Sequence, residues 1–306
     1  MKITALISCL FLSFSMTGAA EVYVLPAVAA GVEGDHGSLW ETEVRILSVD
    51  PLAEIEIRRL WVCTPEGGFL DDPETGPRWM IWGLERGLQM TGEELLGVES
   101  DLELGAVALE ITGGEVLVNS YVADVSVGET VPEVGQAIYG LGQLIPAQTE
   151  ALSGPSHLPW MGACADFPDV YSGSAPPCRS PYRNNIGLAN PSPEPMVFTV
   201  RVLPMGHLIE MGLYEPQPEE FEIVVPPYGW KQTSWMPSWG YWEGWGVHAH
   251  YAVWTIVNLI PEDERPYYAY VSVVFSPEDP EVTPFSDPSY IPAQPGYIPP
   301  RREVEN

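Results

Sequence analysis

The fold of this chain is decided by residues 40–58, which read WETEVRILSVDPLAEIEIR. In 40–46, apolar side chains and one threonine alternate with charged side chains, and the alternation resumes in 54–58 after the Asp50-Pro51 turn. Because successive side chains of a β-strand point to opposite faces, each run predicts a strand with one apolar and one charged face. Two such strands joined by a turn predict a sheet that buries one side.

The same pattern continues along the chain. Gly113-Gly114 lies between two alternating runs and predicts the turn of a hairpin. Helix is expected only at 91–96, because 32 prolines and 29 glycines interrupt the sequence. Several short antiparallel strands, each polar on one face, predict an all-β sandwich fold. Further strands are expected at residues 105–111, 115–123, 185–190, 196–203, 219–225, 247–256 and 266–275.

Two landmarks indicate an internal duplication. The tetrapeptide Ile-Pro-Ala-Gln occurs at 145–148 and again at 291–294. The strand openings at 40–47 and 182–189 precede these tetrapeptides in the same order and at nearly the same spacing. The expected division of the chain is a signal peptide, two domains and a C-terminal tail, at residues 1–20, 21–150, 151–294 and 295–306.

The segments that carry a resemblance to known proteins are Trp40–Ser48, Tyr182–Asn190, Gly140–Ala147 and Tyr268–Val274. A chain with these segments resembles uncharacterised secreted bacterial proteins that contain two tandem immunoglobulin-like sandwiches. The resemblance implies two tandem immunoglobulin-like antiparallel β-sandwiches over most of the mature chain. It carries no catalytic residue over to this sequence. The tryptophan-rich segment 234–246 departs from the pattern and is interpreted as an insertion.

Residues 1–20 have the three-part layout of a secretory signal peptide. One lysine is followed by an apolar run that ends at Phe14 and then by small residues at 17–20. We expect cleavage to give a mature chain that begins at Glu21, in the periplasm or outside the cell. The apolar run is too short to span a bilayer, and no membrane insertion is expected after cleavage. Cys9 as a lipid-bearing residue is the alternative, but it leaves no usable apolar segment before it.

The charge of the chain restricts its partners. It contains 42 acidic and 13 basic residues, for a net charge of −29. A surface this acidic repels phosphate backbones, which excludes nucleic acid as a partner, and anionic membranes are poor partners for the same reason. The expected partner is an unidentified protein or glycan.

The cysteines divide into a pair and a single residue. Cys164 and Cys178 lie in a segment rich in proline, glycine and serine, and in an exported chain they are expected to form a disulfide. The stabilisation expected from such a loop is about 3 kcal/mol. Metal ligation by this pair is the alternative, but no further ligands lie at finger-like spacing. Cys63 is expected to be buried in a strand and unreactive.

Six of the eleven tryptophans fall between residues 230 and 254. Four of them, Trp235, Trp239, Trp242 and Trp245, lie among glycines and a proline, which predicts a loop. In one interpretation they form a small core of their own or pack between the domains. In the other they form a flat aromatic surface that stacks on sugar rings, and these four residues are the predicted ligand site.

Metal sites are a further possibility that the sequence raises. His248 and His250 lie two apart in an expected strand and share a face, so that with Glu243 they form a candidate zinc site. The alternative is a pair of half-buried histidines at a sheet edge. The acidic turns at 71–74 and 278–281, with a third at 262–264, are candidate calcium ligands or simply solvated turns. None of these turns has the spacing of a defined calcium loop.

Catalytic motifs are missing from the sequence. It contains no Gly-x-Ser-x-Gly elbow, His-Glu-x-x-His pair or glycine-rich phosphate loop. We therefore expect a non-catalytic secreted protein with a structural, adhesive or partner-binding role. The alternative function is carbohydrate binding on the tryptophan loop, and an enzyme that acts on a polysaccharide ranks third.

The export prediction is tested by the mature N-terminus. Protein recovered from the periplasm or the medium should begin at Glu21, and it should carry no lipid because Cys9 leaves with the signal peptide. N-terminal sequencing and intact-mass spectrometry measure both properties. A chain that still begins at Met1, or a lipid mass at Cys9, would contradict the prediction.

Overall fold

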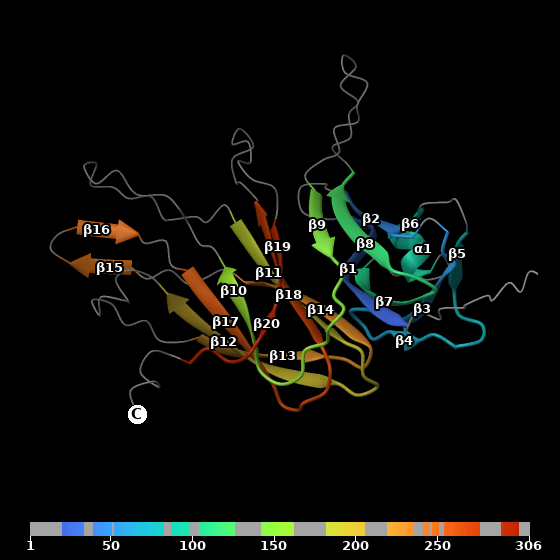
Figure 1. The fold of residues 1–306 in the computed structure, drawn as a ribbon. Coiled ribbons are helices and arrows are strands. Elements are labelled where there is room, and N and C mark those ends of the chain that lie inside the picture. Colours follow the sequence, from blue (N-terminus) through green and yellow to red (C-terminus); the bar gives the residue numbers. More distant parts are fainter. Residues whose placement is uncertain are drawn as a thin grey trace, which may run out of the picture.

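The computed structural model is almost entirely β-strand, as the sequence predicts (Figure 1). The strands gather into two β-sandwiches, and β15 (Tyr241–Gly244) and β16 (Val247–His250) form a separate hairpin. The predicted all-β sandwich fold is therefore confirmed. The structure describes residues 20–33, 39–50, 52–82, 87–97, 104–125, 142–161, 182–205, 219–235, 241–244, 247–250, 254–275 and 289–299.

The first sandwich is formed by β1 (Glu21–Glu33), β2 (Leu39–Ser48), β3 (Ile55–Cys63), β4 (Phe69–Leu70), β5 (Arg78–Ile81), β6 (Gly87–Thr91), α1 (Gly92–Leu96), β7 (Leu104–Thr112), β8 (Val116–Asp124) and β9 (Gly142–Pro146). One layer runs β4-β3-β7-β1, with β5 also pairing with β3, and the other runs β1-β2-β8-β9, with β6 pairing with β2. Strand β1 belongs to both layers, because 21–29 pairs with β7 and 30–33 pairs with β2. The change of partner falls between Ala29 and Ala30, and the pairing with β2 then bulges at Gly31, whose φ of 71° favours glycine.

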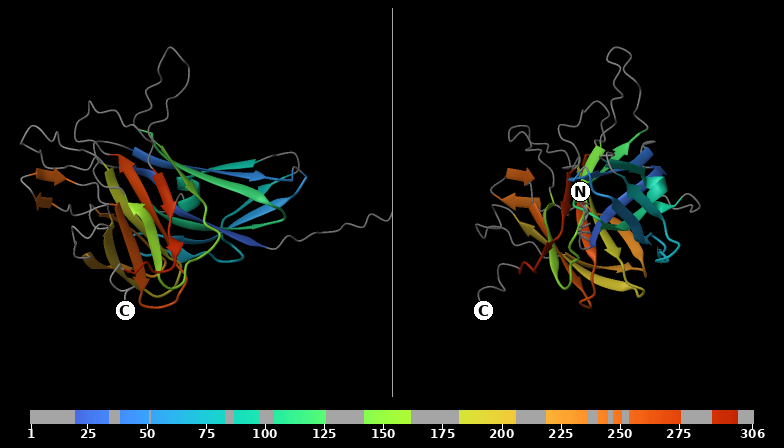
Figure 2. Two further views of the ribbon diagram at one scale, coloured as in Figure 1. Left: turned by 60° about the vertical axis from the view of Figure 1, so that its left-hand side comes forward. Right: turned by 45° about the vertical axis from the view of Figure 1, so that its right-hand side comes forward.

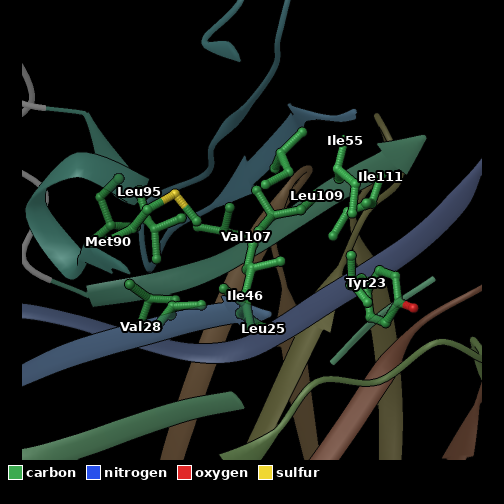
Figure 3. Close-up of a cluster of buried hydrophobic side chains, with 14 of the residues drawn as sticks. Tyr23, Leu25, Val28, Ile46, Ile55, Met90, Leu95, Val107, Leu109 and Ile111 are labelled. Carbon is green, nitrogen blue, oxygen red and sulfur yellow. The ribbon is translucent and has the colours of Figure 1, made fainter. Parts of the chain in front are cut away.

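Helix α1 begins where the sequence predicts a single helical turn. The Thr91 side chain accepts a hydrogen bond from the backbone N–H of Glu94, and the Glu94 carboxylate accepts one from the backbone N–H of Thr91. This capping box places Leu95 and Leu96 in the core of the first sandwich. In Figure 3, Leu95 lies at one end of a row of core side chains that extends to Ile111. Within the described residues, no helix is long and apolar enough to cross a bilayer.

The second sandwich is formed by β10 (Ser156–Met161), β11 (Tyr182–Asn190), β12 (Met196–Met205), β13 (Glu219–Val225), β14 (Gly229–Trp235), β17 (Trp254–Pro261), β18 (Tyr268–Phe275), β19 (Ser289–Pro292) and β20 (Gln294–Pro295). Its layers run β13-β12-β17-β10-β20 and β14-β11-β18-β19. Side chains from both layers form its core, in which the Phe198 and Tyr267 rings meet edge to face with centroids 4.9 Å apart.

The two sandwiches have the same strand order. Strands β5-β3-β7-β1 of the first correspond to β13-β12-β17-β10 of the second, and β6-β2-β8-β9 correspond to β14-β11-β18-β19. The repeated tetrapeptides occupy equivalent places. Ile145 lies in β9 and Ile291 in β19, while Gln148 bridges to Val24 of β1 and Gln294 pairs with β10. A duplication would produce this correspondence.

A third apolar core joins the two sandwiches, and the sequence does not predict it. The outer face of β1, β3 and β7 packs on the outer face of β11, β14 and β18, so that the two bodies lie against each other (Figure 2). The expectation that each sheet is polar on its outer face is wrong here, because both faces of β7 are buried. The buried residues of this core are Val24, Trp61, Cys63, Ala106, Ala108, Ala189, Trp230, Tyr268 and Tyr270.

A buried ion pair holds the β3–β5 connection onto the first sandwich. Arg59 and Asp71 form two hydrogen bonds, at 2.6 and 3.0 Å, and their side chains are only 6% and 9% exposed. Arg59 Nη1 also donates to the carbonyl oxygen of Leu95 at 2.7 Å, which satisfies the end of α1. Beyond Arg59 a bulge precedes Trp61 and turns that ring toward the second sandwich.

The Arg59–Asp71 pair should contribute more to stability than an ion pair at the surface. Asp71→Ala leaves a buried guanidinium without its partner and should lower the free energy of unfolding by about 3–5 kcal/mol. Glu56→Ala removes the pair with Arg78, whose side chains are 41% and 43% exposed, and should change it by at most about 1 kcal/mol. Chemical denaturation measures both variants, and equal losses would contradict the prediction.

Candidate functional site

The four tryptophans of the predicted platform are only partly described. Trp235 is the last residue of β14, and Trp242 lies in β15. For both of these the structure describes the backbone alone, and Trp239 and Trp245 lie outside the described residues. An aromatic platform at these positions therefore stays a prediction.

The predicted zinc ligands are brought onto one hairpin. His248 and His250 lie in β16, and the pairing of β16 with β15 sets Glu243 directly opposite His248. The side chains of these three residues lie outside the described part of the chain, so zinc binding stays a prediction. Among the residues that are described, no group of three His, Cys, Asp or Glu side chains could hold a metal ion.

Three carboxylates of the acidic turns have hydrogen-bond or ion-pair partners in the described part of the chain. Asp71 and Asp263 each pair with an arginine. Asp72 accepts a hydrogen bond from the backbone N–H of Glu74 at 2.7 Å, and this bond lowers the pKa of the Asp72 carboxyl below its ordinary value. The turn at 278–281 lies outside the described residues. The carboxylates of Asp71, Asp72 and Asp263 thus already have partners within the protein, which disfavours calcium binding at these turns.

Cys63 is buried, as the sequence predicts. It lies in β3 within the core between the sandwiches, and its thiol donates to the carbonyl oxygen of Asn190 with an S–O distance of 3.4 Å. Burial raises the pKa of the Cys63 thiol far above its ordinary value, which keeps it protonated and unreactive. Cys164 and Cys178 lie outside the described residues, so their disulfide stays a prediction.

The structure contains a cavity of about 490 Å³ between the two sandwiches. It lies beside the third core, where β1 crosses from one layer of the first sandwich to the other. Its volume is within the range of small-molecule sites. The lining residues that bear on its chemistry are Glu33, Trp40, Val122, Gln143, Asn185, Trp230, Gln232, Tyr270 and Ser272.

Two buried aromatic rings form one wall of the cavity. Trp230 Nε1 donates to the carbonyl oxygen of Pro26 at 2.8 Å, and the Tyr270 hydroxyl donates to Gln232 Oε1 at 2.9 Å. Burial raises the pKa of Tyr270, so its hydroxyl remains neutral. The ring of Tyr270 lies across Gly187, its partner in β11, where an added Cβ would be 2.0 Å from two ring carbons.

An amide bridge crosses from one sandwich to the other. The Ser272 hydroxyl donates to Gln143 Oε1 at 2.9 Å, which joins β18 to β9. The Gln143 side chain is only 5% exposed, yet its Nε2 has no hydrogen-bond partner. A buried donor without an acceptor is rare and destabilising. Since Gln143 lines the cavity, an acceptor placed there could satisfy it.

The opening of the cavity is mostly uncharged. Trp40 and Val122 are half-buried, while Glu33 and Gln232 are exposed, and Glu33 is the one charged side chain among the described lining residues. The remaining lining residues are apolar, aromatic, amide or hydroxyl side chains. Such a site can bind through hydrogen bonds and stacking, and none of its described residues carries a positive charge with which to hold an anion.

Sequence reasoning missed this site because its residues look ordinary in their own strands. Asn185 and Ser272 alternate with core residues along β11 and β18, which is the pattern of a solvent face, and Gln232 is an exposed residue of β14 that follows the exposed Lys231. This alternation predicts which face of a strand points away from its own core. It does not predict that a second sandwich covers that face.

Glycine at position 187 should be required by the Tyr270 ring. Gly187→Ala displaces that ring, breaks its bond to Gln232 and should lower the free energy of unfolding by about 1–3 kcal/mol. Urea denaturation measures the loss. In a Tyr270→Ala background the same substitution should have a much smaller effect, because the clashing ring is gone. Equal losses in both backgrounds would show that the backbone, and not the ring, requires glycine.

Comparison of the chain with protein-family models, with curated proteins and with solved structures found no match.

Proposed function

We propose that this protein is a non-catalytic binding protein that acts outside the cytoplasm and holds a small ligand between its two sandwiches. The observation that carries the proposal is the cavity of about 490 Å³, whose walls come from both sandwiches. Cavities of this size, with apolar walls and a few converging polar groups, are typical ligand sites. The predicted signal peptide supports the location.

The junction supports the proposal because it fixes the cavity walls before any ligand arrives. Thr64 forms a parallel bridge with Gly229, and its carbonyl oxygen accepts the backbone N–H of Trp230 at 2.7 Å. Gly68 N–H donates to the carbonyl oxygen of Tyr228, also at 2.7 Å. These backbone hydrogen bonds and the adjacent apolar core hold the two sandwiches together. A preformed site loses less conformational entropy when it binds a ligand.

A structural or adhesive role is the second candidate, and an exposed apolar patch favours it. Leu47 lies opposite Leu117, and Tyr121 lies opposite Leu144, on the outer face of β2, β8 and β9. All four side chains are exposed. Exposed apolar groups that gather on one face often mark a protein-binding surface. The tandem immunoglobulin-like architecture implied by the resemblance would suit this role.

Filling the cavity should abolish ligand binding. Val122→Trp places an indole inside the cavity, while Leu117→Trp places the same indole on the outer face of the same strand as a control. Saturation-transfer NMR against a panel of neutral, charged and apolar small molecules measures binding. We expect at least one probe to give a signal that only Val122→Trp removes. A panel with no cavity-dependent signal would contradict the proposed function.

A further inference from the structure

We infer that the cavity takes an uncharged, hydroxyl-rich ring, such as a hexopyranose unit of a glycan. This inference rests on the proposed function, which it narrows from a small ligand to one chemical class. Three features of the lining support it, namely an unsatisfied donor, a set of amide and hydroxyl groups, and an aromatic ring at the opening.

The unsatisfied donor is Gln143 Nε2. One end of this amide is fixed by the Ser272 hydroxyl, so the side chain is already oriented and loses little freedom when it binds. The other end is buried and has no partner. A ligand oxygen that accepts this N–H replaces a destabilising feature of the free protein with a hydrogen bond, which makes the gain larger than at an exposed amide.

The other polar groups come from the facing sheet. Asn185, Gln232 and Ser272 line the cavity from β11, β14 and β18. Amides offer donors and acceptors side by side, and a hydroxyl offers both on one atom. Sugar hydroxyls are likewise donors and acceptors at once. A ring that bears several hydroxyls can therefore bond to both sandwiches at the same time.

The aromatic ring at the opening is Trp40. It is half-buried, in contrast to Trp230 and Tyr270, which are buried within the core between the sandwiches. An indole face that is partly accessible provides an apolar surface for the C–H groups of a sugar ring. The site thus combines stacking on the half-buried Trp40 with hydrogen bonds to groups that are more deeply buried, namely Gln143, Asn185 and Ser272.

The charge of the lining favours a neutral sugar over anionic and cationic ligands. None of the described residues that line the cavity is a lysine, arginine or histidine, and the chain carries a net charge of −29, so anionic ligands are disfavoured. An organic cation could use the aromatic rings and Glu33. A quaternary ammonium group donates and accepts no hydrogen bonds, however, and would leave Gln143 Nε2 unsatisfied. A neutral ring with several hydroxyl groups can stack on the aromatic side chain and also form hydrogen bonds with the amide and hydroxyl groups of the lining.

Isothermal titration of the full mature protein tests the ligand class. The probes are glucose, galactose, mannose and their disaccharides, with glucuronate, choline and an apolar alcohol as charged and apolar comparisons. We expect saturable binding of at least one neutral sugar. Gln143→Leu should weaken it by roughly tenfold to a hundredfold, because the bond to the buried donor is lost. Trp40→Ala should weaken it through the loss of stacking.

Two controls keep the variants interpretable. Gln89→Leu and Trp82→Ala change the same residue types at exposed positions outside the cavity lining and should leave binding unchanged. Circular dichroism shows whether Gln143→Leu folds, and Trp40→Ala, on the half-buried rim, provides an independent variant if it does not.

The outcomes distinguish this inference from the proposed function. Binding of choline, glucuronate or the alcohol in the cavity without any sugar would overturn the sugar assignment and leave a ligand-binding cavity. Sugar binding that is unchanged in Gln143→Leu and Trp40→Ala but lost in Trp235→Ala would also overturn it. The tryptophan segment would then be the binding site. No cavity-dependent binding of any probe would overturn both.

Discussion

The contact between the outer faces of two sheets is the constraint on which the rest of the structure depends. The first sandwich contributes small side chains such as Ala106 and Ala108, and the second contributes the large rings of Trp230, Tyr268 and Tyr270. Small residues opposite large ones allow two sheets to approach closely and pack without voids. The backbones are then near enough to form hydrogen bonds across the junction. The cavity has walls from both bodies because this contact fixes their relative position.

The alternation of apolar and polar residues was enough to predict most of the secondary structure within each sandwich. The alternation in 40–46 and 54–58 predicted two strands that the structure contains as β2 and β3, and the helical turn expected at 91–96 is α1. The strand expected at 247–256 is instead described as β16 (Val247–His250) and β17 (Trp254–Pro261). Periodicity reports the direction of side chains within a strand, and it locates the ends of a strand least reliably.

The third core and the cavity lie beyond the reach of such patterns. Gly105 to Leu109 form a continuous apolar run, which is typical of a strand buried on both sides but does not say what covers each side. Gln143 and Ser272 are 129 positions apart, and neither is unusual in its own strand. The cavity depends on where the two sandwiches meet, and that position is set by shape complementarity between surfaces that a single sequence does not relate to each other.

The strongly acidic composition helps to explain why the junction and the cavity are both almost free of charge. Two bodies that share a net charge of −29 repel each other, so their contact has to come from apolar packing and backbone hydrogen bonds. Several of the described cations are used locally, since Arg58, Arg59, Arg78 and Arg265 each pair with a carboxylate on their own sandwich. A site within such a junction is therefore lined almost entirely by uncharged side chains. Selection among ligands must then depend on hydrogen-bond geometry and ring stacking, which are short-ranged and are screened little by salt.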